Sequence, residues 1–136
     1  MKEIYVEIVT PSKVGYKGEV KSITVPGALG NFQVLFNHAP LMSSFEVGII
    51  KIVDMSDQQH IFATGGGTVE VMDNKILLLA ESLEKPEDID INRAEEAKKR
   101  AEARMKNLYD EAIDFTRAET ALQRAINRIN IVNKKI

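Results

Sequence analysis

Arginine is the residue type whose spacing in this chain most clearly indicates a binding site. All six arginines lie at or after position 93, in two sets with relative positions 0, 7 and 11: Arg93, Arg100 and Arg104, then Arg117, Arg124 and Arg128. At 100° per residue, each set falls within about 40° of arc and would form one stripe along a helix. Guanidinium groups match phosphate oxygens in pairs, so two converging stripes would bind an anion.

A second interpretation of the arginines stays open. Arginine is a good helix former, and nearby Glu and Asp residues would pair with it on a solvated helix face. The spacing alone does not decide between this solvated face and an anion site.

The other polar residues form no recognisable catalytic or metal-binding set. Gly65-Gly66-Gly67 lacks the Gly-Lys-Ser/Thr of a phosphate loop, so we expect a tight bend or bulge at a sheet edge. His38 lies in a turn-like stretch, where a hydrogen bond to backbone is the expected role, and His60 is isolated. The chain has no cysteine. We therefore expect no catalytic residue, no metal site and no enzymatic activity of the chain itself.

Composition argues against several classes of partner. The formal net charge is −2, which does not favour nucleic acid or anionic lipid. No apolar run approaches the ~20 residues that a membrane-spanning helix needs. The first residues alternate and carry charges, so we expect no signal peptide. We therefore expect that the chain does not bind nucleic acid and does not insert directly into a bilayer.

Glycine and proline divide the chain near Pro86. All 8 glycines and all 4 prolines lie at or before this residue, and both residue types weaken helix interiors. Residues 1–86 therefore predict a strand-rich domain, and residues 87–136 a helical one. Alternating apolar residues indicate strands around positions 4–8, 20–25 (with one extra residue that indicates a bulge), 34–35, 47–53, 69–71 and 76–80. Asp73-Asn74 is typical of a hairpin turn between the last two.

The helical part contains an internal repeat of 24 residues. Ile89-Asp90-x-x-Arg93-Ala94 falls on Ile113-Asp114-x-x-Arg117-Ala118. Asp90 and Asp114 are expected N-caps, with a Thr116–Glu119 capping box as an alternative start of the second helix. The short connection around 110–114 predicts antiparallel helices. They would meet through a thin, alanine-rich seam on apolar stripes at Ala94, Ala97, Ala101, Met105 and Leu108, and at Phe115, Ala118, Leu122, Ala125, Ile126 and Ile129.

These observations predict an α+β chain, in which an N-terminal antiparallel β-sandwich or small barrel (1–86) is followed by a C-terminal two-helix antiparallel hairpin (87–136). Because the seam is thin, the hairpin should be the less stable part.

Several segments, in order along almost the whole chain, resemble the epsilon-subunit family of bacterial F-type ATP synthases. The segment 35–41 is similar to the family's Val-Leu-Pro-x-His-Ala-Pro stretch, although Phe36 replaces the usual proline and Gln33 the usual glycine. Further matches are 6–11, 66–71, 76–81 and the Ile-Asp-x-x-Arg-Ala motif at 89–94.

The resemblance implies a sandwich of about ten strands followed by a mobile helical hairpin. It also implies a non-catalytic central-stalk subunit of a proton-translocating synthase, peripheral at the cytoplasmic face of the bacterial cell membrane. The expected partners are the gamma subunit, the ring of c-subunits (contacted near Asn31 and His38) and, when the helices extend, the alpha/beta catalytic head. The extended helices would inhibit ATP hydrolysis.

The family's regulatory ATP site is implied at positions whose residue types match here. ATP, with or without Mg, would stabilise the folded-down hairpin. The implied residues are Glu84, Ile89, Asp90, Arg93, Arg100, Arg124 and Arg128. A free-standing nucleotide-sensing module that uses the same arginines is the alternative function.

Overall fold

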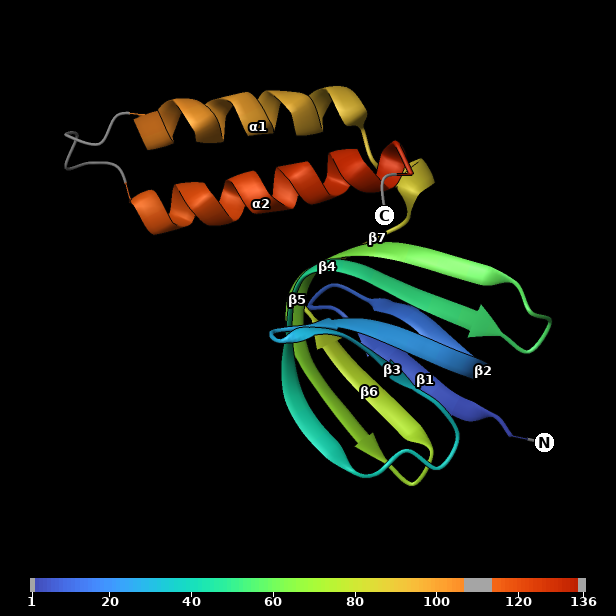
Figure 1. Cartoon of the computed structure of the whole chain (residues 1–136). Helices are drawn as coiled ribbons and strands as arrows, with labels where there is room; N and C mark the ends of the chain where they lie inside the picture. The colour runs from blue at the N-terminus through green and yellow to red at the C-terminus, as the bar shows by residue number, and fades with distance from the viewer. Residues whose placement is uncertain (1, 107–113, 135–136) are drawn as a thin grey trace. The chain divides into compact units, whose positions relative to one another are not determined.

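The computed structural model describes residues 2–106 and 114–134. They divide into two compact units, and the boundary along the chain lies between Lys85 and Pro86. The first unit contains β-strands, and the second a short 3-10 helix and two α-helices (Figure 1). The strands are β1 (Ile4–Val9), β2 (Val14–Gly27), β3 (Gly30–Val34), β4 (Leu41–Asp54), β5 (Gln59–Met72), β6 (Lys75–Ala80) and β7 (Leu83–Glu84).

The strands form one sheet that closes on itself. Its order is β1-β6-β5-β4-β2-β3, and β1 also pairs with β2, which closes the barrel. Every pairing is antiparallel except that of β1 with β6, which is parallel. The expected fold class is therefore confirmed, with one parallel pair that residue alternation does not reveal.

Within the described ranges, seven strands take the place of the ten or so that the resemblance implied. The difference arises because β2, β4 and β5 have 14 residues each. Two of these strands change partner along their length: β2 pairs with β1 through 14–20 and with β3 through 23–27, and β5 pairs with β6 through 67–72 and with β7 through 63–64. The expected bulge in β2 is present, since its register with β4 shifts between Val20 and Ser22.

The core of the first unit follows the alternation of its strands. Ile4, Val6 and Ile8 of β1 are buried, and so are Ile76 and Leu78 of β6. They join one cluster with inward residues of β2, β4 and β5. Each such aliphatic side chain contributes roughly 1.5–3 kcal/mol when fully buried.

The glycine run at 65–67 lies inside β5, so the expected position at a sheet edge is wrong. β5 has β4 on one side, and β6 and β7 on the other. Gly66 has a φ of 96°, and a Cβ at Gly67 would clash with the carbonyl oxygen of Leu79. Glycine is therefore needed where β5 bends and passes from one partner to the next.

The second unit contains η1 (Pro86–Asp88), α1 (Ile91–Lys106) and α2 (Phe115–Val132), and the two α-helices lie side by side in antiparallel directions (Figure 1). Asp90 Oδ1 accepts hydrogen bonds from the backbone N–H groups of Asn92 and Arg93. Asp114 Oδ1 accepts from Arg117 N, so Asp114 rather than the alternative capping box begins α2. Leu108 and the connection at 107–113 lie outside the described residues.

Candidate functional site

Four alanines form the buried seam of the hairpin. Ala94 and Ala101 of α1 and Ala118 and Ala125 of α2 are each no more than 4% exposed. They are equivalent in the 24-residue repeat, so the two helices pack through the same positions. Alanine lets the backbones approach closely but buries little apolar area, and the seam is correspondingly weak.

The seam places the arginines of both helices on one face of the hairpin. Arg93, Arg100, Arg117 and Arg124 each come one residue before a seam alanine. Two antiparallel helices that pack through equivalent positions are related by an approximate two-fold axis. Side chains offset in the same direction from the seam therefore point to the same face. The opposite direction of the helices then brings Arg93 to the same end as Arg128.

The arginines on this face differ in exposure. Arg93 and Arg100 are exposed, whereas Arg124 and Arg128 are half-buried. Arg117 on the same face is exposed as well. A face that combines exposed and half-buried guanidinium groups suits a ligand with several anionic oxygens, because each group donates paired hydrogen bonds. Lys98 lies on the other side of the seam from Arg93, because it is four residues after Ala94 rather than one before it.

The remaining residues of the expected ATP site have separate structural roles. Asp90 caps α1, as described above, and thereby fixes the backbone that carries Arg93. Ile89 is half-buried, and its N–H donates to the carbonyl oxygen of Pro86 at 3.2 Å. Glu84 is half-buried on β7 of the first unit, where it pairs with Ala63.

The two residues expected to contact the c-ring lie in the first unit. Asn31 is exposed on β3, and His38 lies in the turn between β3 and β4. His38 N donates to the Leu35 carbonyl oxygen at 3.1 Å, and Nδ1 of the ring lies 2.6 Å from the Ala39 carbonyl oxygen. A carbonyl oxygen only accepts, so Nδ1 carries the proton. The expected backbone-bonded turn histidine is thus confirmed.

An exposed apolar surface on the first unit was missed by the sequence analysis. Met42 is 77% exposed, Met72 51%, Leu77 37% and Leu79 52%. Strand register places Met42, Glu70 and Leu77 in one row across β4, β5 and β6. We call Met42, Met72, Leu77 and Leu79 the outer-face patch. The run Leu77-Leu78-Leu79 was a usable signal, because successive residues of a strand cannot all face the core.

A shallow hollow of about 550 Å³ adjoins the outer-face patch. It is lined by Met72 and Leu77 together with Tyr5, Glu7, Glu70, Asp73, Lys75 and Ile76. Three carboxylates and one lysine thus surround an apolar centre. Such a surface suits a protein partner with apolar and basic side chains better than a small anion.

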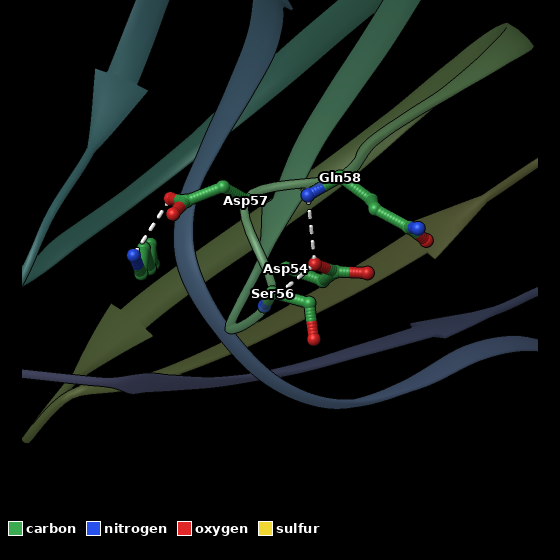
Figure 2. Close-up of polar contacts among 5 residues, drawn as sticks. Asp54, Ser56, Asp57 and Gln58 are labelled. Carbon is green, nitrogen blue, oxygen red and sulfur yellow. Dashed lines mark hydrogen bonds and ion pairs between the residues drawn. The ribbon is translucent and has the colours of Figure 1, made fainter.

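His60 has a partner that the sequence analysis did not find. Its Nε2 lies 2.8 Å from Oδ2 of Asp54, and its ring is tilted against that of Tyr16 at 6.0 Å. Oδ1 of Asp54 accepts hydrogen bonds from Ser56 N and Gln58 N in the turn between β4 and β5 (Figure 2). The expectation of an isolated histidine is wrong, because the hairpin register brings residues six apart in sequence together.

The surroundings of this turn shift the pKa values of two groups, the Asp54 carboxyl and the Tyr16 hydroxyl. The hydrogen bond from His60, helped by the Gln58 and Ser56 N–H groups, lowers the pKa of Asp54. Burial, with the nearby charge of Asp54, raises the pKa of Tyr16.

Residues 2–106 and 114–134 contain no group of three or more His, Cys, Asp or Glu side chains arranged to hold a metal ion. In the same ranges, neither helix is long and apolar enough to cross a bilayer.

Two family models together cover nearly all of the chain. Residues 3–86 match the ATP synthase delta/epsilon chain β-sandwich domain, and residues 87–133 match the long α-helix domain of the same chain. The chain is 42% identical over 130 residues to the ATP synthase epsilon chain of Nitratidesulfovibrio vulgaris, covering 96% of each protein. It is 38% identical over 134 residues to that of Halalkalibacterium halodurans, covering 98% of this chain and 100% of the relative.

Solved structures share the fold at lower sequence identity. A chain of the Euglena gracilis mitochondrial ATP synthase superposes with a TM-score of 0.82 at 20% identity, over 92% of this chain and 78% of that one. A central stalk/c-ring structure of the Tetrahymena thermophila enzyme gives a TM-score of 0.56 at 15% identity, over 96% and 94%.

Proposed function

The chain belongs to the delta/epsilon family of ATP synthase subunits, and we propose that it is a non-catalytic rotor subunit that couples the catalytic head of an F-type synthase to its c-ring. The observation that carries this proposal is the match of both domains, in order, at 38–45% identity to proteins named ATP synthase epsilon chain. The subunit would lie at the cytoplasmic face of the bacterial cell membrane, bound peripherally through the complex.

Gamma is the proposed partner of the outer-face patch. Exposed apolar side chains on neighbouring strands are costly in water and mark a protein contact. The carboxylates of Glu7, Glu70 and Asp73 around the hollow favour a partner surface with basic residues beside its apolar contact. The turn that carries His38, together with Asn31, is the proposed contact to the c-ring.

The helical hairpin is the proposed regulatory element. Its seam of four alanines is weak enough to open, as a conformational switch requires. The arginines that share one face would bind the phosphates of ATP, with or without Mg, only while the hairpin is closed. ATP would thus stabilise the folded-down form, and the extended form would reach the alpha/beta head and inhibit hydrolysis.

Copurification tests the subunit assignment directly. A tagged chain expressed in its own cells should bring down gamma and the c-ring in stoichiometric amounts after mild detergent extraction. A free-standing nucleotide sensor would carry the same arginines but would purify without gamma and without the c-ring. Recovery of the tagged chain alone, with intact synthase left in the membrane fraction, would contradict the proposal.

A further inference from the structure

A pair of asparagines joins the turn that carries His38 to the far end of another hairpin. Asn37 N donates to Oδ1 of Asn74 at 2.6 Å, and Asn74 Nδ2 donates weakly to Oδ1 of Asn37 at 3.5 Å. The two residues are 37 positions apart in sequence. Asn74 occupies the turn between β5 and β6, and its carbonyl oxygen accepts from Tyr5 N of β1 at 2.9 Å. One residue thus ties three parts of the first unit together.

The turn at 35–40 has little else to hold it. Leu35 and Phe36 are 50% and 36% exposed, so the turn gains little from core burial. The hydrogen bond from His38 N to the Leu35 carbonyl oxygen stays within the turn. Across the described part of the chain, the hydrogen bonds that tie residues 35–40 to another element are those to Asn74.

The other side of the Asn74 turn belongs to the proposed gamma contact. Asp73 and Lys75, which flank Asn74, both line the hollow beside the outer-face patch. We propose that Asn74 is a positioning residue that fixes the c-ring contact turn to the gamma contact surface. This inference rests on the proposed function, since it assigns the two surfaces to those partners. Torque between gamma and the c-ring then passes in part through the short hydrogen bond from Asn37 N to Asn74 Oδ1 rather than through a loosely held loop.

The turn conformation permits a variant that removes only this tie. Asp73 and Asn74 have φ values of 51° and 61°, as in a type I′ hairpin turn. Glycine suits the second position of that turn, so Asn74→Gly keeps the hairpin and removes the side-chain acceptor. Asn74→Asp tolerates the same backbone and keeps Oδ1 as the acceptor. Asn37→Gly keeps the backbone N–H and the positive φ of Asn37, and loses only the weak 3.5 Å contact.

Amide hydrogen exchange of the full-length isolated chain measures the tie itself. In Asn74→Gly, the Asn37 amide should exchange about fivefold faster than in the wild type, which corresponds to about 1 kcal/mol for one lost hydrogen bond. Asn74→Asp and Asn37→Gly should stay close to the wild-type rate. An unchanged Asn37 rate in Asn74→Gly would overturn the positioning role at once.

The assembled synthase measures the consequence for coupling. Membranes carrying Asn74→Gly should pump fewer protons per ATP hydrolysed than wild type, while Asn74→Asp restores the ratio and Asn37→Gly retains it. If Asn74→Gly speeds exchange of the Asn37 amide but leaves the pumping ratio unchanged, torque is not transmitted through Asn74. The subunit assignment would stay intact. Failure of even the wild-type chain to assemble with gamma would instead refute the proposed function on which this inference depends.

Discussion

Nε2 of His60 lies 2.8 Å from Oδ2 of Asp54, and this side-chain contact joins the start of β5 to the end of β4 across the turn between them. The other oxygen of Asp54 holds the same turn through two backbone N–H groups. A single carboxylate thus has three hydrogen-bond donors, and all three favour its ionised form. A second residue of this turn, Asp57 (Figure 2), also makes a side-chain contact. Its carboxylate pairs with Lys21 of β2 at 2.6 Å.

We predict that Asp54 makes the first unit sensitive to acid. Because its pKa in the folded chain is lowered, its contribution to the free energy of unfolding is present above the unfolded value near 3.9 and is lost as pH falls through the folded value. Asp54→Asn keeps an Oδ1 acceptor for Ser56 N and Gln58 N but has no charge. Urea unfolding between about pH 5 and pH 2 should therefore show a shallower decline of stability in the variant, and parallel declines would contradict the prediction.

Removal of the helical unit should raise ATP hydrolysis by the assembled synthase severalfold. A chain cut after Pro86 keeps every strand and the whole core of the first unit, so it should stay folded and still bind gamma. The hydrolysis rate of purified complexes with whole and truncated chains is the measurement, and circular dichroism of the truncated chain is the control. If complexes with the whole and the truncated chain hydrolyse ATP at equal rates, both after preincubation with ATP and without it, the hairpin is not inhibitory.

ATP should bind the isolated chain through the shared arginine face. Arg93→Ala and Arg124→Ala should each weaken binding by about one to two decades, because a charge-assisted contact to phosphate contributes roughly 1.5–3 kcal/mol. Lys98→Ala is the matched control, since Lys98 lies on the other side of the alanine seam. Isothermal titration calorimetry compares the three variants. Wild-type affinity in both arginine variants would make these side chains surface residues or contacts of the extended form.

A charge placed in the outer-face patch should disrupt binding to gamma. Leu77→Glu would bury an unpaired carboxylate in the contact and weaken the complex by at least about tenfold. Leu77 lies opposite Glu7 and Glu70 in strand register, so the added carboxylate should also lower the free energy of unfolding, by roughly 0.2–1 kcal/mol for each like-charge pair, and circular dichroism checks that the variant is folded. Leu29→Glu, at the fully exposed turn between β2 and β3, is the control and should bind gamma normally. Pull-down with gamma gives the comparison, and equal binding of both variants would exclude the patch as the gamma contact.

Local chemistry and periodicity were readable from the sequence. Alternation identified β1 and β6 with their buried faces, because successive side chains of a strand point to opposite sides. Asp73-Asn74 predicted its turn, since both residues tolerate positive φ, and Asp90 and Asp114 predicted the helix starts, since a short side-chain oxygen satisfies free N–H groups. The 24-residue repeat predicted the alanine seam, because the same spacing on two antiparallel helices selects the same contact positions.

Only the tertiary structure decided which strands become neighbours and which faces stay open. The parallel β1–β6 pair, the bond between Asn37 and Asn74 and the contact of His60 with Asp54 all depend on register and chain closure. Alternation assigns a side chain to a face of its own strand but carries no information on what lies across from it. The outer-face patch was hidden for the same reason: alternation places Leu77 and Leu79 on the outer face of β6, but only the strand register shows that Met42 and Met72 share that face.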